Sequence, residues 1–340
     1  MAVTGEPRVP EFFGIGDADP GALAGHRVAV VGYGTLGRSL ALNLRDSGVP
    51  VIIGNAADAY RDRAASDGFT PVPIAEAVTA ADEILVLLPD AVIGDCFQRE
   101  IGPALRGGSA ICFASGYALT FGLVAPDPDV DVLLLAPRLP GELVRRAYLE
   151  GTGFISCLSV EADATGQAKR RLLALAAATG SLRRGAFALS ARDETVLDLL
   201  VEQTLGVYLG LGIQLAFRIG VEAGLPAEAL VMELYMSGEI SSTMDAFARD
   251  GLFRSVSSHS MTALYGGFAR SSEIDGEALE TMFRATLADI RGGGFARRLQ
   301  DEMAAGAPTI TAIRDILNSP NPISAAEANV RAALRSEPGR

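Results

Sequence analysis

The chain has 340 residues, of which 49% are hydrophobic and 21% are charged, and its formal net charge is −12. This composition is typical of a globular protein with room for two domains, and it excludes a disordered chain. The acidic balance argues against nucleic acid or an anionic membrane as the main partner.

Other whole-chain features point to the reducing cytoplasm. The three cysteines are scattered and form no metal-binding pair, and the two histidines exclude a histidine-rich metal site. No apolar signal core begins the sequence, and we expect no apolar run as long as a membrane span.

The first half of the chain predicts a Rossmann-type domain over residues 1–185. Residues 1 to about 25 are rich in Gly, Pro and Asp and are expected to form a lead-in. Short apolar runs then alternate with helical segments, and the strand-bearing stretches are "HRVAVVGYGTLGRSLALNLRDSGVPVIIG", "ADEILVLLPD", "GSAICFASGY", "DVDVLLLAPRLPG" and "GTGFISCLSV". This alternation is typical of a parallel sheet covered on both faces.

Strand-like runs disappear after about residue 185, and the rest of the chain predicts an all-helical domain over residues 186–340. The expected long helices are 191–223, 226–250, 256–268 and 275–291. Gly224, Gly251 and the "RGGGF" stretch provide the stops between them.

A glycine-rich turn, "GYGTLG", follows the first predicted strand and opens a helix. In that context the pattern indicates a dinucleotide site. Gly32 allows the tight turn, Gly34 lets the backbone approach a pyrophosphate, and Gly37 lets the helix pack close to the strand. The choice between NAD and NADP stays open, because Asp58 would repel a 2′-phosphate whereas Arg61 and Arg63 could attract one.

Two acids stand on an otherwise apolar helical stretch, "VLDLLVEQTLGVYLGLGIQLAF". Asp198 and Glu202 are four residues apart and share one face, with Glu194 one turn earlier. Burying neighbouring carboxylates is costly unless a cation pairs with them, and oxygen ligands of this kind suit Mg²⁺. The alternative is an exposed acidic stripe on the solvent side of the helix.

Four stretches resemble the class I ketol-acid reductoisomerases, also called acetohydroxy acid isomeroreductases. They are "VVGYGTLGRSLALNLRDSGV", similar to that family's nucleotide turn, "VLLPD" and "APRLPGELVRRAYLEGTG", similar to segments lining its active site, and "DLLVEQ", similar to its metal-binding helix. Their order and spacing agree with the family from about residue 10 to 325.

The resemblance implies a Rossmann domain, a knotted helical domain, NADP or NAD, two Mg²⁺ ions and a homodimer or larger assembly. The family acts in branched-chain amino-acid biosynthesis, where an alkyl migration precedes hydride reduction. The implied metal ligands are Asp198, Glu202, Glu233 and Glu239. The implied catalytic residues are Arg138, Asp198, Glu202, Glu239 and Ser260, the last as a contact to the substrate carboxylate. The implied cofactor-binding residues are Gly32, Tyr33, Gly34, Thr35, Leu36, Gly37, Asn55, Leu88, Pro89, Asp90, Ser115 and Gly141.

Several positions depart from the family pattern. Ser115 replaces a histidine near the nicotinamide, Arg138 replaces a lysine near the metals, and Leu264 replaces a glutamate. In "MELYMSGEISS" the two glutamates, Glu233 and Glu239, are six residues apart rather than four, so only one can be correctly placed without a helix irregularity. His259, beside Ser260, could reach the pocket or point away from it.

The first metal site is therefore expected to be intact and the second weakened. Isomerisation depends most on the paired metals, whereas reduction needs the nucleotide, a polarised carbonyl and a proton source. We expect a diverged NAD(P)H- and Mg²⁺-dependent reductase of a 2-keto acid or related small-molecule carbonyl substrate. The alternatives are an authentic ketol-acid reductoisomerase that converts 2-acetolactate to 2,3-dihydroxyisovalerate, and a non-catalytic nucleotide-binding homologue.

Overall fold

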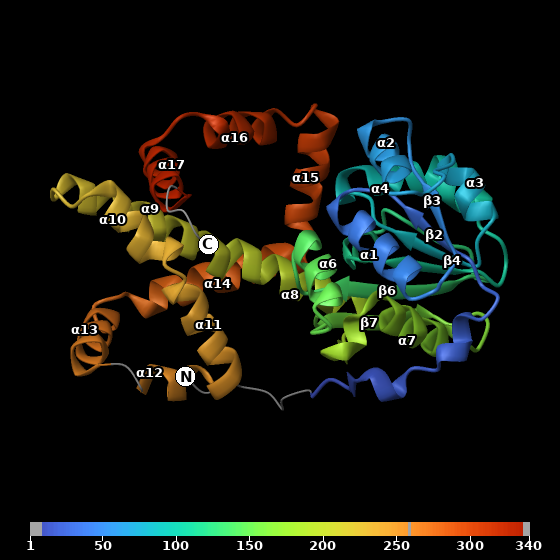
Figure 1. Ribbon diagram of the computed structural model, residues 1–340, viewed down its shortest axis with the longest axis horizontal. Helices are drawn as coiled ribbons and strands as arrows, with labels where there is room; N and C mark the ends of the chain where they lie inside the picture. The colour runs from blue at the N-terminus through green and yellow to red at the C-terminus, as the bar shows by residue number, and fades with distance from the viewer. Residues whose placement is uncertain (1–8, 258–259, 336–340) are drawn as a thin grey trace. The chain divides into compact units, whose positions relative to one another are not determined.

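The computed structural model describes residues 9–257 and 260–335 (Figure 1). The chain divides into two compact units, Met1–Asp198 and Leu199–Arg340. Each unit is described by itself below.

The first unit is built on one eight-stranded sheet with the order β1-β8-β7-β6-β5-β4-β2-β3. The strands β2 to β6 are parallel to one another, β7 runs antiparallel to β6, and β1 runs antiparallel to β8. The strand bounds are β1 Phe12–Phe13, β2 Val28–Val31, β3 Val51–Gly54, β4 Glu83–Val86, β5 Ala110–Phe113, β6 Asp131–Pro137, β7 Ser156–Ala162 and β8 Ala186–Ala188.

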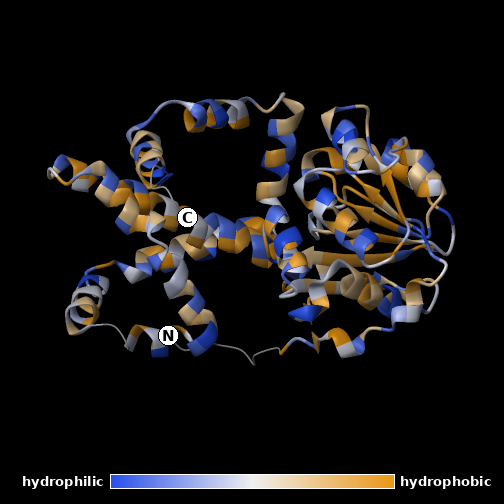
Figure 2. Cartoon of the chain, viewed as in Figure 1, coloured by the Kyte–Doolittle hydropathy of each residue, from blue (hydrophilic) through white to orange (hydrophobic). Residues whose placement is uncertain are grey.

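Helices cover the sheet because the central strands are apolar on both faces. Two buried hydrophobic clusters lie on opposite sides of it, one built on Val28, Val30 and Leu85 and the other on Ala29, Val31 and Ile84. The strands accordingly show as hydrophobic ribbons in Figure 2. The helices are α1 Thr35–Asp46, α2 Ala59–Ser66, α3 Ile74–Thr79, α4 Asp90–Cys96, α5 Tyr117–Thr120, α6 Gly141–Leu149, α7 Ala168–Thr179 and the start of α8, Ala191–Val201.

The sheet extends further along the chain at both ends than the sequence pattern indicates. The expected lead-in contributes β1, whose residues pair with β8, and β8 itself begins one residue after 185. Three-residue and two-residue strands are too short for a periodicity argument, so tertiary pairing alone reveals them.

The second unit contains only helices among its described residues, as expected. They are α9 Val207–Glu222, α10 Ala227–Val231, α11 Glu239–Asp250, α12 Leu252–Ser257, α13 Met261–Ser271, α14 Gly276–Arg291, α15 Gly294–Ala304, α16 Pro308–Asn318 and α17 Pro322–Arg335. Two π-helical turns interrupt this series, η6 Glu202–Gly206 and η7 Met232–Met236. Such π-turns frequently mark functional positions.

One continuous helix, 191–222, is long and apolar enough to cross a membrane by length and composition alone. The expectation that no apolar run reaches this length is therefore wrong. The charged residues Glu194, Asp198 and Glu202 lie in the first half of this helix, and the second half is mostly apolar.

A buried arginine, Arg171, binds two acids at the amino ends of the central strands in the first unit. The Arg171 side chain is 6% exposed and pairs with Glu83 at 2.8 Å and with Asp131 at 2.9 Å, and both acids are fully buried. It also donates to the carbonyl oxygens of Gly108 and Asp82. This cluster lies at the opposite end of the parallel strands from the glycine turn, so its role is structural.

Candidate active site

The glycine turn connects β2 to α1 at the carboxyl edge of the sheet. Gly32 has φ +95°, and a Cβ there would lie 2.7 Å from the Leu87 carbonyl oxygen. A Cβ on Gly37 would lie 2.0 Å from the Gly32 carbonyl oxygen, whereas Gly34 has open space around it. Gly32 and Gly37 are thus required for packing of the turn itself, and Gly34 leaves the backbone accessible to a ligand.

A cavity of about 810 Å³ opens in front of this turn. It lies beyond the carboxyl ends of β2, β3, β4 and β5, where the chain order reverses between β3 and β4 on either side of β2. Ligands of open parallel sheets bind at such switch points. The predicted cofactor residues that line the cavity are Gly32, Tyr33, Gly34, Thr35, Leu36, Asn55, Leu88, Pro89, Asp90 and Ser115.

Two predicted cofactor residues, Gly37 and Gly141, are not among those that line the cavity. A Cβ on Gly141 would lie 2.8 Å from the Leu36 backbone nitrogen. The structure therefore places Gly141 against the start of α1, where its missing side chain lets α6 approach the turn.

A network of side-chain hydrogen bonds holds the glycine turn in place. Tyr33 is fully buried, and its hydroxyl donates to Asp67 Oδ2 at 3.0 Å. Arg38 donates to both oxygens of the same carboxylate, at 2.6 and 2.9 Å. The Arg38 guanidinium holds the pKa of Asp67 below its usual value. The Tyr33 backbone N–H donates to Asn55 Oδ1 at 2.9 Å, which joins the turn to the end of β3.

Arg138 follows β6 directly and bridges two acids on α8. Its Nη2 donates to Glu194 Oε1 at 2.5 Å and its Nη1 donates to Asp198 Oδ1 at 2.8 Å. The Glu194 side chain is 1% exposed, the Arg138 side chain 23% and the Asp198 side chain 46%. The cluster is therefore buried at one end and open at the other.

Glu194 also connects this cluster to the cavity. Its Oε2 accepts the backbone N–H of Gly116 at 2.8 Å, and the neighbouring Ser115 lines the cavity. A Cβ on Gly116 would lie 2.1 Å from the Ala191 carbonyl oxygen, so only glycine lets this loop pack on α8. Burial raises the pKa of Glu194, and the Gly116 N–H and the Arg138 guanidinium oppose that rise.

The predicted metal ligands are carried by irregular helices. Asp198 lies in the last turn of α8, and Glu202, four residues later, is the first residue of the π-turn η6. Glu233 lies in the π-turn η7, Gly238 has φ +85°, and Glu239 is the first residue of α11. The expected irregularity between Glu233 and Glu239 is present as a π-turn and a left-handed glycine.

The described residues contain no cluster of three or more His, Cys, Asp or Glu side chains arranged to hold a metal ion. Asp198, Glu202, Glu233 and Glu239 thus remain predicted ligands. Ser260 caps α13, its hydroxyl accepting from the Ala263 backbone N–H at 3.2 Å. His259 lies outside the described residues.

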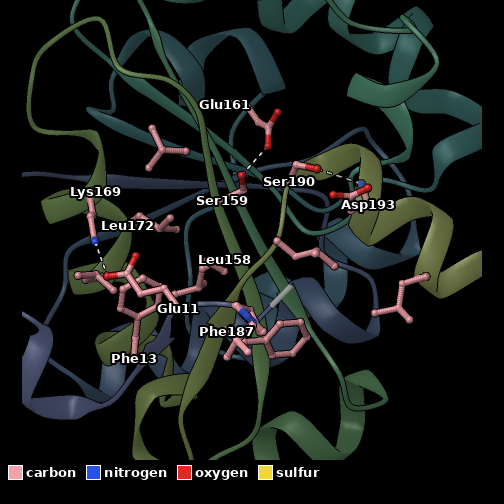
Figure 3. A pocket seen from close by; sticks show the side chains of 17 residues that line it. Glu11, Phe13, Leu158, Ser159, Glu161, Lys169, Leu172, Phe187, Ser190 and Asp193 are labelled. Atoms are coloured by element: carbon pink, nitrogen blue, oxygen red, sulfur yellow. Dashed lines mark hydrogen bonds and ion pairs between the residues drawn. The ribbon is translucent and has the colours of Figure 1, made fainter. Parts of the chain in front are cut away.

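A second cavity, of about 850 Å³, lies over β1, β7 and β8 beside α7 and α8 (Figure 3). Its floor is apolar, with Leu158, Leu172 and Phe187, and its polar groups are paired with one another, as in the Lys169–Glu11 ion pair at 2.9 Å. None of the predicted site residues lines it. The chemistry is therefore expected at the smaller cavity.

Comparison with known proteins identifies the family. Residues 22–185 match "Acetohydroxy acid isomeroreductase, NADPH-binding domain", and residues 192–336 match "Ketol-acid reductoisomerase, C-terminal domain". The chain belongs to the ketol-acid reductoisomerase family. It is an NAD(P)H-dependent oxidoreductase of that family, with the nucleotide-binding domain first and the helical domain second, as predicted.

Solved structures agree with this ketol-acid reductoisomerase assignment. An NADH-preferring ketol-acid reductoisomerase from an uncultured archaeon is 31% identical, with a TM-score of 0.89 over 95% of this chain and 98% of that one. A semialdehyde dehydrogenase NAD-binding protein from Cupriavidus necator is 19% identical, with a TM-score of 0.62 over 78% of this chain and 98% of that one. The second likeness shows the fold alone.

Glu194 is a site residue that the sequence pattern does not single out. The sequence pattern places Glu194 on the acidic stripe without assigning it to the site, yet its carboxylate contacts both Arg138 and Gly116. The available signal was the spacing of Glu194, Asp198 and Glu202, each one turn from the next. What the sequence could not show is which of the three is buried.

Proposed function

We propose that this ketol-acid reductoisomerase family member reduces a 2-keto acid or related carbonyl compound and has a weakened alkyl-migration step. One observation carries the proposal: the Arg138 guanidinium donates a hydrogen bond to the Asp198 carboxylate. The family pattern has a lysine in place of Arg138. A second feature supports it. A π-turn and the left-handed Gly238 lie between Glu233 and Glu239, which are six residues apart, where the family pattern has two glutamates four residues apart on one helix.

The residues of the first metal site fit a divalent cation. Asp198 and Glu202 present carboxylate oxygens on one helical face, and hard oxygen ligands suit Mg²⁺. When bound, the cation would polarise the substrate carbonyl. Asp198 and Glu202 would hold it together with water or substrate oxygens, and Glu233 or Glu239 would hold a second ion.

The chain's own residues account for binding and orientation. The turn at Gly34 and the wall formed by Leu88, Pro89 and Ser115 hold the dinucleotide. Arg138, whose bond to the half-exposed Asp198 borders solvent, would bind the anionic substrate, but a guanidinium does not lose its proton in proteins and is therefore no source for the proton that reaches the carbonyl oxygen. That proton must come from another group or from water.

The cofactor is proposed to be NADH rather than NADPH. At the end of β3 the cavity is lined by Asn55 and Asp58, and Asn55 Nδ2 donates to Asp58 Oδ1 at 2.8 Å. Arg61 points to the Pro71 carbonyl oxygen at 3.2 Å, outside the cavity lining. The Asp58 carboxylate would accept from a ribose hydroxyl and repel a 2′-phosphate. The similar archaeal enzyme is likewise described as NADH-preferring.

Substitution of Asp58 tests this preference. Asp58→Ser keeps a helix-capping oxygen for α2 and removes the charge. We expect the ratio of kcat/KM for NADH to that for NADPH to fall by roughly tenfold, the equivalent of removing one unfavourable charge contact. Equal use of both cofactors by the unsubstituted enzyme would contradict the proposal.

We also propose a homodimer or larger homo-oligomer in the cytoplasm. Few apolar side chains are buried in the described part of the second unit, and they are Phe217, Val231, Ile290, Ala296, Ala326 and Val330. The apolar side chains exposed along its first helices are Leu205, Val207, Leu209, Leu211, Leu215, Ile219 and Val221. An apolar helix this exposed is expected to be covered by a second copy. Light scattering coupled to gel filtration measures the assembly.

The reaction is tested by following NADH and NADPH oxidation with Mg²⁺ on 2-acetolactate and on 3-hydroxy-3-methyl-2-ketobutyrate, the product of its alkyl migration. We expect turnover of the second compound and little of the first. Full turnover of both would establish the second candidate, an authentic ketol-acid reductoisomerase. That candidate is supported by matches of both domains and by 31% identity across nearly the whole chain.

A further inference from the structure

The three nitrogens of the Arg138 guanidinium have different partners. Nε donates to the Ala136 carbonyl oxygen at 3.3 Å, Nη2 to Glu194 Oε1 and Nη1 to Asp198 Oδ1. The backbone and Glu194 therefore hold the group in place, and one remaining arm reaches Asp198. A planar fork with fixed spacing is what allows one side chain to bind two carboxylates at once.

The two acids differ in how firmly they are held. Glu194 is 1% exposed and uses its second oxygen for the Gly116 N–H, so its carboxylate is fixed on both sides. Asp198 has a side chain that is 46% exposed, and its bond to Arg138 borders solvent. The Asp198 contact is consequently the one that can open while the rest of the cluster stays in place.

We propose that Arg138 lowers the divalent-cation affinity of the site by competing for the Asp198 carboxylate. The inference rests on the proposed cation role of Asp198. The same Oδ1 cannot keep a full interaction with a guanidinium and coordinate a cation, because the two positive groups repel at that distance. A cation that takes Oδ1 requires Nη1 to release Asp198, and a cation that takes Oδ2 shares the carboxylate with the guanidinium at close range; either cost lowers the affinity.

An arginine at position 138 competes with the cation for Asp198 at every pH at which the protein is folded. A guanidinium cannot lose its proton to relieve the repulsion, and its fork reaches both acids. An ammonium at the same position is a single point charge that can stay with buried Glu194. Arg138 is thus a specificity-determining residue for how strongly the enzyme takes up its metal.

The experiment measures cation binding by the full-length protein, with Mg²⁺ by calorimetry and Mn²⁺ by electron paramagnetic resonance. Arg138→Lys keeps the charge and is expected to tighten binding by roughly tenfold, the size of one charge-assisted hydrogen bond. Arg146→Lys is the matched control, because Arg146 is exposed on the nearby helix α6 and pairs only with Glu150 among the ion pairs of the described residues. Its affinity is expected to stay within about twofold of the parent.

A third variant tests whether the tighter cation binding depends on the Asp198 carboxylate. Asp198→Asn added to Arg138→Lys should remove the gain, and thermal unfolding of each variant shows that the proteins compared are folded. Unchanged or weaker binding in Arg138→Lys would overturn the inference while leaving the proposed cation role standing. Absence of binding in both the parent and Arg138→Lys would instead refute the cation role of Asp198, and the inference with it.

Discussion

Two arginines in the first unit each bridge a pair of acids, yet they do so in opposite surroundings. Arg171 joins Glu83 and Asp131 at the amino ends of the strands, where all three side chains are almost fully buried. Arg138 joins Glu194 and Asp198 at the carboxyl edge, where one acid is buried and the other is half-exposed. Both clusters pair one guanidinium with two carboxylates, and they differ in how far those side chains are buried.

The difference separates a structural cluster from a functional one. Arg171 also donates to two backbone carbonyl oxygens, so few of its N–H groups remain to bind a ligand. Arg138 has one partner, Asp198, that borders solvent and can exchange a guanidinium for a ligand. Breaking a closed buried cluster should cost stability, whereas breaking the open cluster should mainly change binding and turnover.

The largest effect on stability is expected for Arg171→Met. Removing the guanidinium leaves Asp131 without a cation and Glu83 with only the His26 ring, 2.8 Å away, and breaking a buried pair typically costs about 3–5 kcal/mol. Urea unfolding at pH 7 measures the loss. Arg170→Met, on the same helix and exposed in its pair with Asp19, is the control and should lose no more than about 1 kcal/mol. Equal losses in the two variants would show that the buried cluster is not a main support of the fold.

A smaller loss of stability is expected for Arg138→Met, about 1–3 kcal/mol. Asp198 can be rehydrated, and Glu194 keeps the Gly116 N–H, so a single buried oxygen loses its partner. Turnover with the preferred keto acid should nevertheless fall far more than in the control Arg146→Met. If Arg138→Met destabilised the protein as much as Arg171→Met, the contrast between open and closed clusters would be wrong.

The fold and the nucleotide turn could be predicted because they depend on local signals. Alternating apolar runs predicted the sheet, and the spacing of Gly32, Gly34 and Gly37 predicted the turn. The short strands β1 and β8 could not be predicted, because two or three residues carry no periodicity and pairing decides them.

The candidate site was predictable in its residue types but not in its contacts. Asp198, Glu202 and Arg138 were singled out from the sequence, and the structure brings Arg138 and Asp198 together. The part played by Glu194 depends on its burial against Gly116, which is a property of packing between elements distant in sequence. The roles of Glu233 and Glu239 stay predictions, because helix irregularities at η7 and Gly238 override the simple spacing rule.

A third arginine pair, Arg38 with Asp67, has no fully buried member and should show the smallest effect. The folded-state pKa of Asp67 is lower than its unfolded value, which is ordinarily about 3.9. Its stabilisation is therefore fully present above that value and is lost as the pH falls through the lower folded-state pKa. Asp67→Asn should cost about 1 kcal/mol at pH 7, because the side chains are partly exposed.

The pH dependence distinguishes this ion pair from a mere packing effect. The difference in unfolding free energy between the parent and Asp67→Asn should be constant from pH 7 to about pH 5 and should shrink below about pH 4, because protonation of Asp67 removes the charge in the parent as well. Asp62→Asn, at an exposed acid of helix α2, which ends just before Asp67, provides the control and should show a small difference at every pH. A difference for Asp67→Asn that stays constant down to pH 2.5 would mean that the hydrogen bonds from Tyr33 and Arg38 stabilise the turn without the carboxylate charge. Burial would then set the stability contributed by all three arginine clusters through the geometry of their hydrogen bonds and not through the interaction of their charges.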